Sequence, residues 1–177
     1  MAIAQENGMK RLNIFDKALG VLLLIAILLF AAKALSLSTY QDKDCLAQNI
    51  YFEAGNQPFS GKLAVANVVL NRVDNPQFPN TICEVVKQSK RYRLSFITGE
   101  LIPVRGLCQF SWFCDGYADE PQDSVTWTES ARIAEFAISS QIDITNGALY
   151  YHANYTTPYW AAHLERLVQI ETHIFYK

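Results

Sequence analysis

Residues 44–61 read DCLAQNIYFEAGNQPFSG, and the fold prediction starts from this stretch. If residues 44–54 form a helix, Leu46, Ile50 and Glu53 share one face, at the spacing i, i+4, i+7. An apolar helix face points into a protein core, where a carboxylate is rarely found without a reason. Glu53 is therefore either a solvated glutamate that ends a helix or an acid that is placed for chemistry.

The segments that follow have a mixed pattern, with helices first and short strands later. We expect a turn with Gly55, Pro58 and Gly61, followed by an apolar helix over 62–75 and a short helix that starts near Thr81. Short strands are expected in 91–96 and 108–113. An amphipathic helix over 124–141, capped by Thr128, and strands within 147–155 and 167–177 complete the pattern. This order predicts an α+β domain that is mostly helical and carries a small antiparallel sheet.

Residues 18–32 read ALGVLLLIAILLFAA and contain no charge. A membrane-spanning helix needs about 20 mostly apolar residues, and this run reaches that length if Lys17 and Lys33 extend to the interfaces. Lys10 and Arg11 precede the run, which predicts a cytoplasmic N-terminus.

The predicted organisation therefore has three parts: a cytoplasmic N-terminus over 1–13, a transmembrane signal anchor over 14–37, and an exported domain over 38–177. A cleaved signal peptide is the alternative, since residues 32–34 read AKA.

All four cysteines, Cys45, Cys83, Cys108 and Cys114, follow the apolar run. An even number of cysteines on the exported side fits disulfide bonds, and three pairings are open. Cys108 and Cys114 are close enough for a local loop, in which case Cys45 and Cys83 would join two helices. No metal site is predicted, because the chain has no CxxC motif and its three histidines are scattered.

Composition excludes few functions, but it gives no reason to expect nucleic acid as a partner. The formal net charge is -2, whereas proteins that bind nucleic acid present basic surfaces. Lys90, Arg91, Arg93 and Arg105 form a local basic cluster or an ordinary solvated loop.

At the end of its helix, Glu53 would feel the negative end of the backbone dipole, and an apolar face would add a desolvation cost. Both effects raise the pKa of the carboxyl group. A carboxyl group that keeps its proton near neutral pH can donate it to a glycosidic oxygen. Asp115 and Asp119 are available as a second carboxylate, although nothing in their spacing selects them.

Two further clusters are candidates for substrate binding. Residues 108–116, CQFSWFCDG, place Gln109, Ser111 and Trp112 in one loop, which suits a platform for a sugar ring or an ordinary core turn with a buried tryptophan.

Residues 147–154, GALYYHAN, put Tyr151 on the opposite strand face from Tyr150 and His152. His152 is a base, a substrate hydrogen-bonder or a packed polar residue.

Together these motifs resemble the SleB/CwlJ family of cell-wall hydrolases. The matching stretches are IYFEA, GKLAVANVVLNRV with FPNTICEVV, CQFSWFCDG, GALYYHAN and HIFY, in the family's order from Cys45 to Tyr176. The resemblance implies a lysozyme- or transglycosylase-like fold, cleavage of peptidoglycan, and Glu53 as the catalytic acid. The family often reads EARGE where this chain reads EAGNQ, so Gln57 stands in place of a second acidic residue.

We therefore expect a membrane-anchored, exported glycosidase, monomeric and without a cofactor, that cuts peptidoglycan glycan strands between N-acetylmuramic acid and N-acetylglucosamine as a lytic transglycosylase. Its expected site comprises the acid Glu53 and the substrate-binding residues Gln57, Gln109, Ser111, Trp112, Tyr151 and His152. Two alternatives stay open: an N-acetylmuramoyl-L-alanine amidase, which would usually use zinc, and a wall-binding protein without activity.

Overall fold

The computed structural model describes the backbone of residues 14–177, without the side chains of 14–18, 32 and 34–38. The chain forms two compact units, Met1–Thr39 and Tyr40–Lys177. Helix α1 (Ile14–Ala54) supplies the described part of the first unit and the first helix of the second.

Among the described residues, no helix is long and apolar enough to cross a membrane. The anchor that the sequence predicts over 14–37 gains no support from this result. Some side chains of that segment, and all of the predicted cytoplasmic residues 1–13, lie outside what the structure describes.

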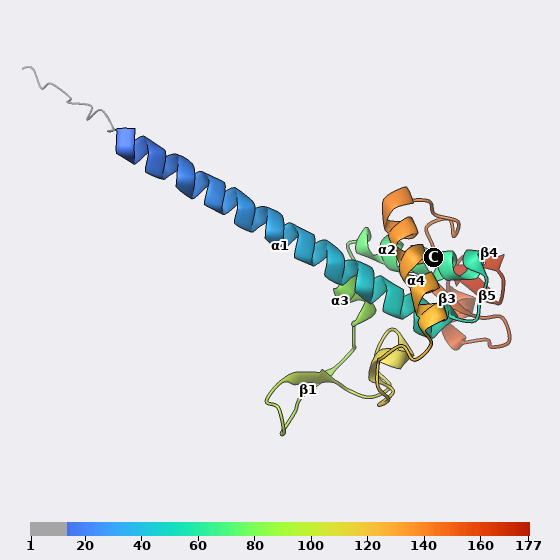
Figure 1. The fold of residues 1–177 in the computed structure, drawn as a ribbon. Coiled ribbons are helices and arrows are strands. Elements are labelled where there is room, and N and C mark those ends of the chain that lie inside the picture. Colours follow the sequence, from blue (N-terminus) through green and yellow to red (C-terminus); the bar gives the residue numbers. More distant parts are fainter. Residues whose placement is uncertain (1–13) are drawn as a thin grey trace, which may run out of the picture. The chain divides into compact units, whose positions relative to one another are not determined.

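The second unit combines helices with two small antiparallel sheets (Figure 1), which confirms the predicted mixed architecture. Its further elements are α2 (Phe59–Val73), α3 (Ile82–Val86), β1 (Tyr92–Leu94), β2 (Leu101–Pro103), the 3-10 helix η1 (Ser111–Cys114), α4 (Ser124–Ser140), β3 (Tyr150–Ala153), the 3-10 helix η2 (Tyr159–His163), β4 (Arg166–Ile170) and β5 (His173–Tyr176).

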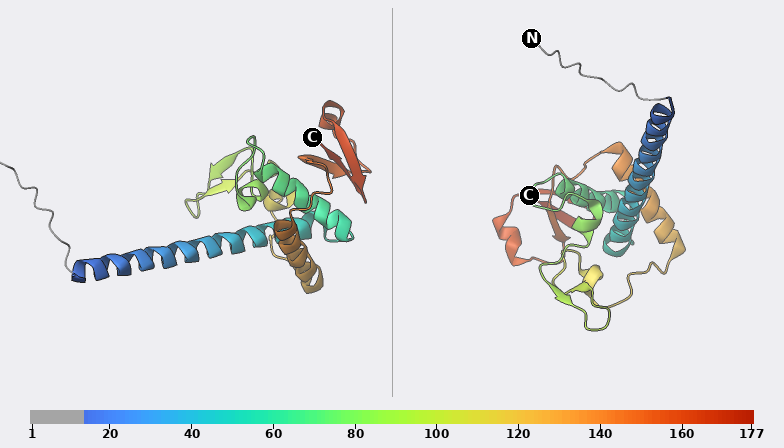
Figure 2. Two further views of the ribbon diagram at one scale, coloured as in Figure 1. Left: turned by 90° about the horizontal axis from the view of Figure 1, so that it is seen from above. Right: turned by 90° about the vertical axis from the view of Figure 1, so that its left-hand side faces the viewer.

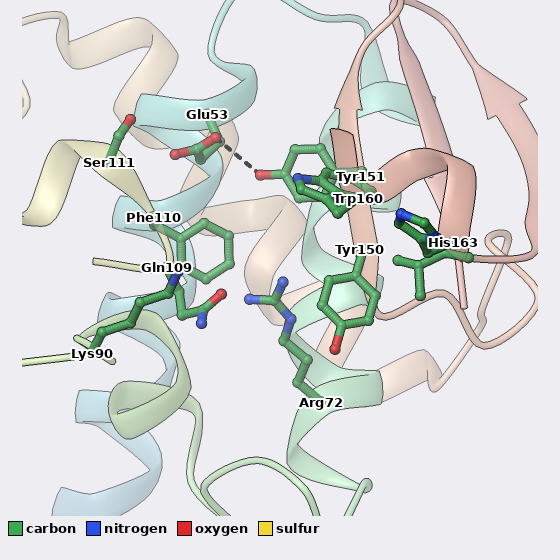
Figure 3. Close-up of a pocket in the computed structure, with 11 residues that line it drawn as sticks. Glu53, Arg72, Lys90, Gln109, Phe110, Ser111, Tyr150, Tyr151, Trp160 and His163 are labelled. Carbon is green, nitrogen blue, oxygen red and sulfur yellow. Dashed lines mark hydrogen bonds between the residues drawn. The ribbon is translucent and has the colours of Figure 1, made fainter. Parts of the chain in front are cut away.

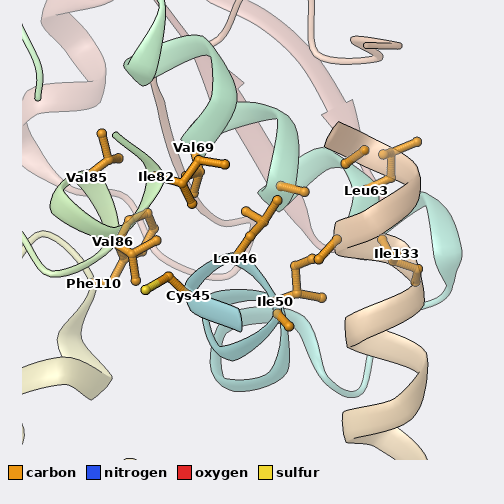
Figure 4. Packing of buried hydrophobic residues seen from close by; sticks show 14 of the residues in the cluster. Cys45, Leu46, Ile50, Leu63, Val69, Ile82, Val85, Val86, Phe110 and Ile133 are labelled. Atoms are coloured by element: carbon orange, nitrogen blue, oxygen red, sulfur yellow. The ribbon is translucent and has the colours of Figure 1, made fainter. Parts of the chain in front are cut away.

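The core of this unit forms where the end of α1 meets α2, α3 and α4 (Figure 4). Leu46 and Ile50 are fully buried, as their spacing predicts, and they pack with Val69 of α2 and Ile133 of α4. The face of α1 that carries Glu53 therefore points inward.

Two helix starts have side-chain caps, and one differs from the sequence prediction. Thr81 accepts a hydrogen bond from the backbone N–H of Glu84 and caps α3, so this helix starts where the sequence predicts. Helix α4 is capped by Asp123, which accepts from the N–H of Thr126, so the prediction of Thr128 was wrong. Thr128 lies inside the helix, where its hydroxyl donates to the Ser124 carbonyl. Aspartate is the better cap because its carboxylate also complements the helix dipole.

Gly61 was predicted to lie in a turn, but it lies inside α2. A Cβ atom at this position would lie 2.8 Å from the Cβ of Gln57. Glycine therefore permits the close approach of the turn to the helix that follows it.

The loop from Cys108 to Cys114 also differs from its prediction. It contains the 3-10 helix η1 instead of a strand. The strand expected within 91–96 exists as β1, and its partner is β2, which the sequence analysis missed.

The second sheet has the order β3-β5-β4, with both pairs antiparallel, in the two segments where strands were predicted. The loop before β3 is held by α2. Asn67 donates to the Ile142 carbonyl over 2.8 Å and accepts from the N–H of Ile144, and Asn71 donates to the Ala148 carbonyl. These bonds fix where β3 begins.

The structure pairs Cys45 with Cys83 and Cys108 with Cys114. The first bond joins α1 to α3, and the second closes the loop that contains η1. Of the three pairings that the sequence left open, this is the one in which Cys108 and Cys114 close a local loop and Cys45 and Cys83 join two helices.

Candidate functional site

A cavity of about 540 Å³ lies between the end of α1, the η1 loop and the β3–η2 region (Figure 3). Its lining brings together residues that are far apart in the chain: Glu53, Arg72, Lys90, Gln109, Phe110, Ser111, Tyr150, Tyr151, Trp160, His163 and Leu164.

Glu53 lies at this cavity on the last turn of α1. The Tyr151 hydroxyl donates a hydrogen bond to its Oε2 over 3.0 Å. Burial raises the pKa of Glu53, while the hydrogen bond from Tyr151 and the charge of Arg72 oppose the rise. The net direction is upward, so the neutral acid is favoured relative to an exposed glutamate.

Arg72 is a buried cation on the cavity wall that the sequence analysis did not select. Its side chain comes from α2, and its Nε donates to the Leu149 carbonyl over 2.8 Å. The guanidinium carbon lies 5.1 Å, 5.2 Å and 5.7 Å from the ring centres of Phe78, Phe110 and Tyr150. Burial lowers the pKa of Arg72, and the nearby Tyr151, Tyr150 and Glu53 groups, in their ionised forms, partly oppose this. Its position places a positive charge in the same cavity as the acid.

Trp112 does not line the cavity, and its role as a sugar platform was predicted wrongly. The side chain is buried, its indole N–H donates to Oδ1 of Asn49 over 3.1 Å, and its ring stacks on Phe52 at 4.7 Å. Asn49 and Phe52 precede Glu53 on the last turns of α1, so Trp112 ties η1 to the helix that carries the acid. Ser111, the preceding residue, consequently faces the cavity beside Glu53 (Figure 3).

Trp160 is the tryptophan that does line the cavity. It lies in η2, and its ring centre is 6.1 Å from that of Tyr150. The sequence contained a signal for it, because PYW at 158–160 resembles the start of a short helix with exposed aromatic residues. That signal is weak without knowledge of where the segment folds.

The other predicted site residues divide into two groups. Gln109 and Ser111 line the cavity together with Glu53 and Tyr151.

Gln57 and His152 do not belong to the lining. Gln57 donates to the side chain of Asn56, and Nε2 of His152 lies 2.9 Å from the Tyr176 hydroxyl. Asp115 and Asp119 are also outside the lining, and Asp115 accepts from the N–H of Tyr117.

No group of three histidine, cysteine, aspartate or glutamate side chains within the described part of the chain could hold a metal ion. His163 lines the cavity, while His173 packs edge-on against Tyr151 at 5.2 Å. A zinc-dependent amidase therefore has no ligand set among these residues.

A comparison with protein-family models matches residues 56–176 to the cell wall hydrolase family. The chain belongs to this family. The match begins just after Glu53, so the role of that residue rests on its position in the cavity. The cell wall hydrolase match confirms the resemblance that the motifs indicated.

Curated relatives of this cell wall hydrolase are spore cortex-lytic enzymes. The enzyme of Halalkalibacterium halodurans is 30% identical over 139 residues, which cover 77% of this chain and 35% of the relative. The enzyme of Bacillus cereus is 29% identical over 137 residues, which cover 77% of this chain and 44% of the relative. The hydrolase thus spans less than half the length of these two relatives.

Two solved structures resemble the fold. The catalytic domain of the germination-specific lytic transglycosylase SleB from Bacillus anthracis matches with a TM-score of 0.56 and 29% identity, over 77% of this chain and 93% of that one. The catalytic domain of the Bacillus cereus SleB protein matches with a TM-score of 0.54 and 27% identity, over 77% and 91% of the two chains. The hydrolase therefore shares the fold of these catalytic domains.

Proposed function

We propose that this protein is a lytic transglycosylase that cleaves peptidoglycan glycan strands, with Glu53 as its general acid and base. The similarity to two solved catalytic domains, one of them that of a lytic transglycosylase, supports this assignment. The raised pKa of Glu53 and its place on the cavity wall support the role of the acid.

The reaction has two proton transfers. Protonated Glu53 donates its proton to the glycosidic oxygen between N-acetylmuramic acid and N-acetylglucosamine, and the bond from that oxygen to C1 of the muramic acid breaks. The 6-hydroxyl of the same muramic acid forms a new bond to C1. Its proton passes to the Glu53 carboxylate, which restores the acid and leaves a 1,6-anhydro end.

The observation that carries this proposal is the chemistry of the cavity wall. Of the described residues that line it, Glu53 is the only carboxylic acid. Hydrolysing glycosidases usually need a second carboxylate to act as a nucleophile or to activate water. An internal hydroxyl group needs neither, so one acid is sufficient.

Tyr151 and Arg72 have a defined part in this cycle. Both favour the ionised form of Glu53, which exists after the first proton transfer. Burial favours the neutral form, which is required before it. The balance lets one carboxyl group give up a proton and then take one back.

Mass spectrometry of digested peptidoglycan tests the proposal. Anhydromuramoyl ends are the expected product. Reducing muramic acid ends would replace the internal hydroxyl by water, and free stem peptides would instead identify an amidase. Peptidoglycan that binds the protein but releases no fragments would identify a wall-binding protein.

Replacing Tyr151 by phenylalanine is expected to move the alkaline limit of activity to higher pH. The substitution removes a hydrogen bond that lowers the pKa of Glu53, so the acid keeps its proton to a higher pH. A pH profile of kcat measures this, with Tyr155→Phe, which changes an exposed tyrosine, as the control. An unchanged or lowered alkaline limit would contradict the proposed role of Tyr151.

Replacing Trp160 by alanine is expected to raise KM for soluble glycan fragments roughly tenfold, with a smaller change in kcat, since an aromatic ring supplies binding area for a sugar. Tyr159→Ala is the matched control, because Tyr159 is the neighbouring residue, is exposed, and is absent from the cavity lining. Equal effects of the two substitutions would exclude Trp160 from the binding site.

We also propose that the protein is exported and held at the membrane by its N-terminal apolar segment. The uncharged run at 18–32 and the exposed leucine side chains of α1 between Leu19 and Leu29 support this location. Separation of membrane and soluble fractions, with protease added to intact cells, tests it. Recovery of the whole protein in the soluble cytoplasm would exclude the anchor.

A further inference from the structure

The hairpin of β1 and β2 presents apolar side chains to solvent. Tyr92 pairs with Pro103 and Leu94 with Leu101 across the two strands. Paired residues share one face of a hairpin, so these four side chains form a single apolar face. Leu94 is 56% exposed and Leu101 is 70% exposed, and neither belongs to the hydrophobic core clusters.

The tip of this hairpin is apolar as well. Phe96 is 97% exposed and Ile97 is 95% exposed. Large apolar side chains at the end of a projecting loop are unfavourable in water, and a contiguous apolar surface of this kind marks an interaction site.

Hydrogen bonds hold the tip in one conformation. The N–H of Ser95 donates to the Glu100 carbonyl over 2.7 Å, and the N–H of Gly99 donates to the Ser95 carbonyl over 2.9 Å. The Ser95 hydroxyl oxygen accepts from the N–H groups of Ile97 and Thr98. Gly99 has φ +72, a conformation that favours glycine. The turn is thus built to display Phe96 and Ile97.

The remainder of the unit supports the base of the hairpin. Ser89 forms an antiparallel bridge with Cys108, which is disulfide-bonded to Cys114. Figures 1 and 2 show the hairpin extending away from the helices of the second unit.

The hairpin and the residues at its base are rich in basic side chains. Residues 90–105 contain Lys90, Arg91, Arg93 and Arg105 against one acidic residue, Glu100, although the whole chain has a net charge of -2. Arg93 pairs with Ile102, on the face opposite to Leu94. The hairpin therefore combines an apolar face and tip with concentrated positive charge.

We propose that the β1–β2 hairpin docks on a lipid bilayer that carries anionic headgroups, with Phe96 and Ile97 inserted among the acyl chains. An apolar surface with basic flanks is the pattern of proteins that bind at the membrane interface. Each basic residue near an anionic surface strengthens binding by roughly fivefold. A glycan strand is a poorer partner, because its hydroxyl groups would lose water against Phe96 and Ile97 without gaining hydrogen bonds.

This contact would set where the enzyme works. Lys90, at the base of the hairpin, also lines the cavity that contains Glu53. Docking of the hairpin would therefore bring the cavity close to the membrane surface.

Tryptophan fluorescence of the full-length protein tests the proposal, with the wild type measured alongside so that the emission of its own three tryptophans is subtracted. The Phe96→Trp variant is reconstituted with vesicles of phosphatidylcholine alone or mixed with phosphatidylglycerol, in which some acyl chains carry bromine as a quencher. The control is Val125→Trp, since Val125 is 75% exposed on α4, away from the hairpin. Both variants keep the N-terminal segment, so any difference between them is local.

Quenching is expected for the tryptophan at 96 in anionic vesicles, at least twofold stronger than at 125, and it should weaken when Arg91→Gln and Arg93→Gln are added. Equal quenching at the two positions would overturn the proposal. So would an emission shift that appears with purified glycan strands instead of vesicles, or one that depends only on protein concentration, which would indicate a second copy as the partner.

Discussion

Replacement of Glu53 by glutamine is expected to lower the rate of glycan cleavage by about 10²–10⁴-fold, the usual contribution of a general acid. Glutamine has nearly the same shape, and its carbonyl oxygen can still accept the hydrogen bond from Tyr151. It has no acidic proton to transfer. The loss should therefore appear in kcat, with little change in KM.

The same substitution is expected to increase stability at neutral pH. Because burial raises the pKa of Glu53, the folded protein holds this proton more tightly than the unfolded chain does. At low pH both states hold the proton and burial has no cost of this kind. As the pH rises, the unfolded chain gives up its proton first, and the folded protein loses stability relative to it. Glutamine avoids that cost, so the melting temperature of the variant should exceed that of the wild type at neutral pH and match it in strong acid.

Rates of release of soluble fragments and melting curves at several pH values measure the two effects. Glu120→Gln is the control, because Glu120 is exposed and lies outside the cavity lining. A Glu53→Gln variant that cleaves peptidoglycan at the wild-type rate would disprove the mechanism. If the variant folds and is inactive but is no more stable than the wild type, Glu53 would keep its role as the acid. The predicted loss of stability from burying its charged form would then be wrong.

Removal of the disulfide between Cys45 and Cys83, by replacing both with alanine, is expected to destabilise the second unit by about 4 kcal/mol. The two cysteines are 38 positions apart in sequence, and the chain entropy that the bond removes from the unfolded state grows with the length of the loop. A loss of this size corresponds to a fall of roughly 10 °C in melting temperature.

The matched control removes the bond between Cys108 and Cys114, which are only 6 positions apart. The same relation gives about 2 kcal/mol for this shorter loop. Thermal or urea unfolding of the two double variants measures both values. A larger loss for the pair at 108 and 114 would show that loop length does not determine the contribution of these bonds.

The sequence predicted those features of the site that depend on local periodicity. The spacing of Leu46, Ile50 and Glu53 was sufficient to place the acid on the inner face of its helix, because the packing of a helix follows its apolar stripe. Alternation of side chains predicted the segments that contain β3, β4 and β5 for a similar reason.

Features that depend on contacts between distant segments were not predictable in this way. Trp112 and Trp160 are both aromatic residues in short irregular segments. Only the fold shows that Trp112 bonds to Asn49 inside the core, whereas Trp160 reaches the cavity. Arg72 falls within an apolar helical stretch, and its place beside the acid depends on the turn and strands that pack around it.

The three rings around Arg72 offer evolution a way to change the working pH of the enzyme without altering its acid. Phe78, Phe110 and Tyr150 hold the guanidinium group from three different segments, and at least Phe78 lies outside the cavity lining. Any substitution that shifts this cation relative to Glu53 alters how readily the acid gives up its proton. Exchange of Phe78, which lies outside the cavity lining, would let descendants of one ancestral enzyme adapt to acidic or alkaline surroundings while the residues that line the cavity stay the same.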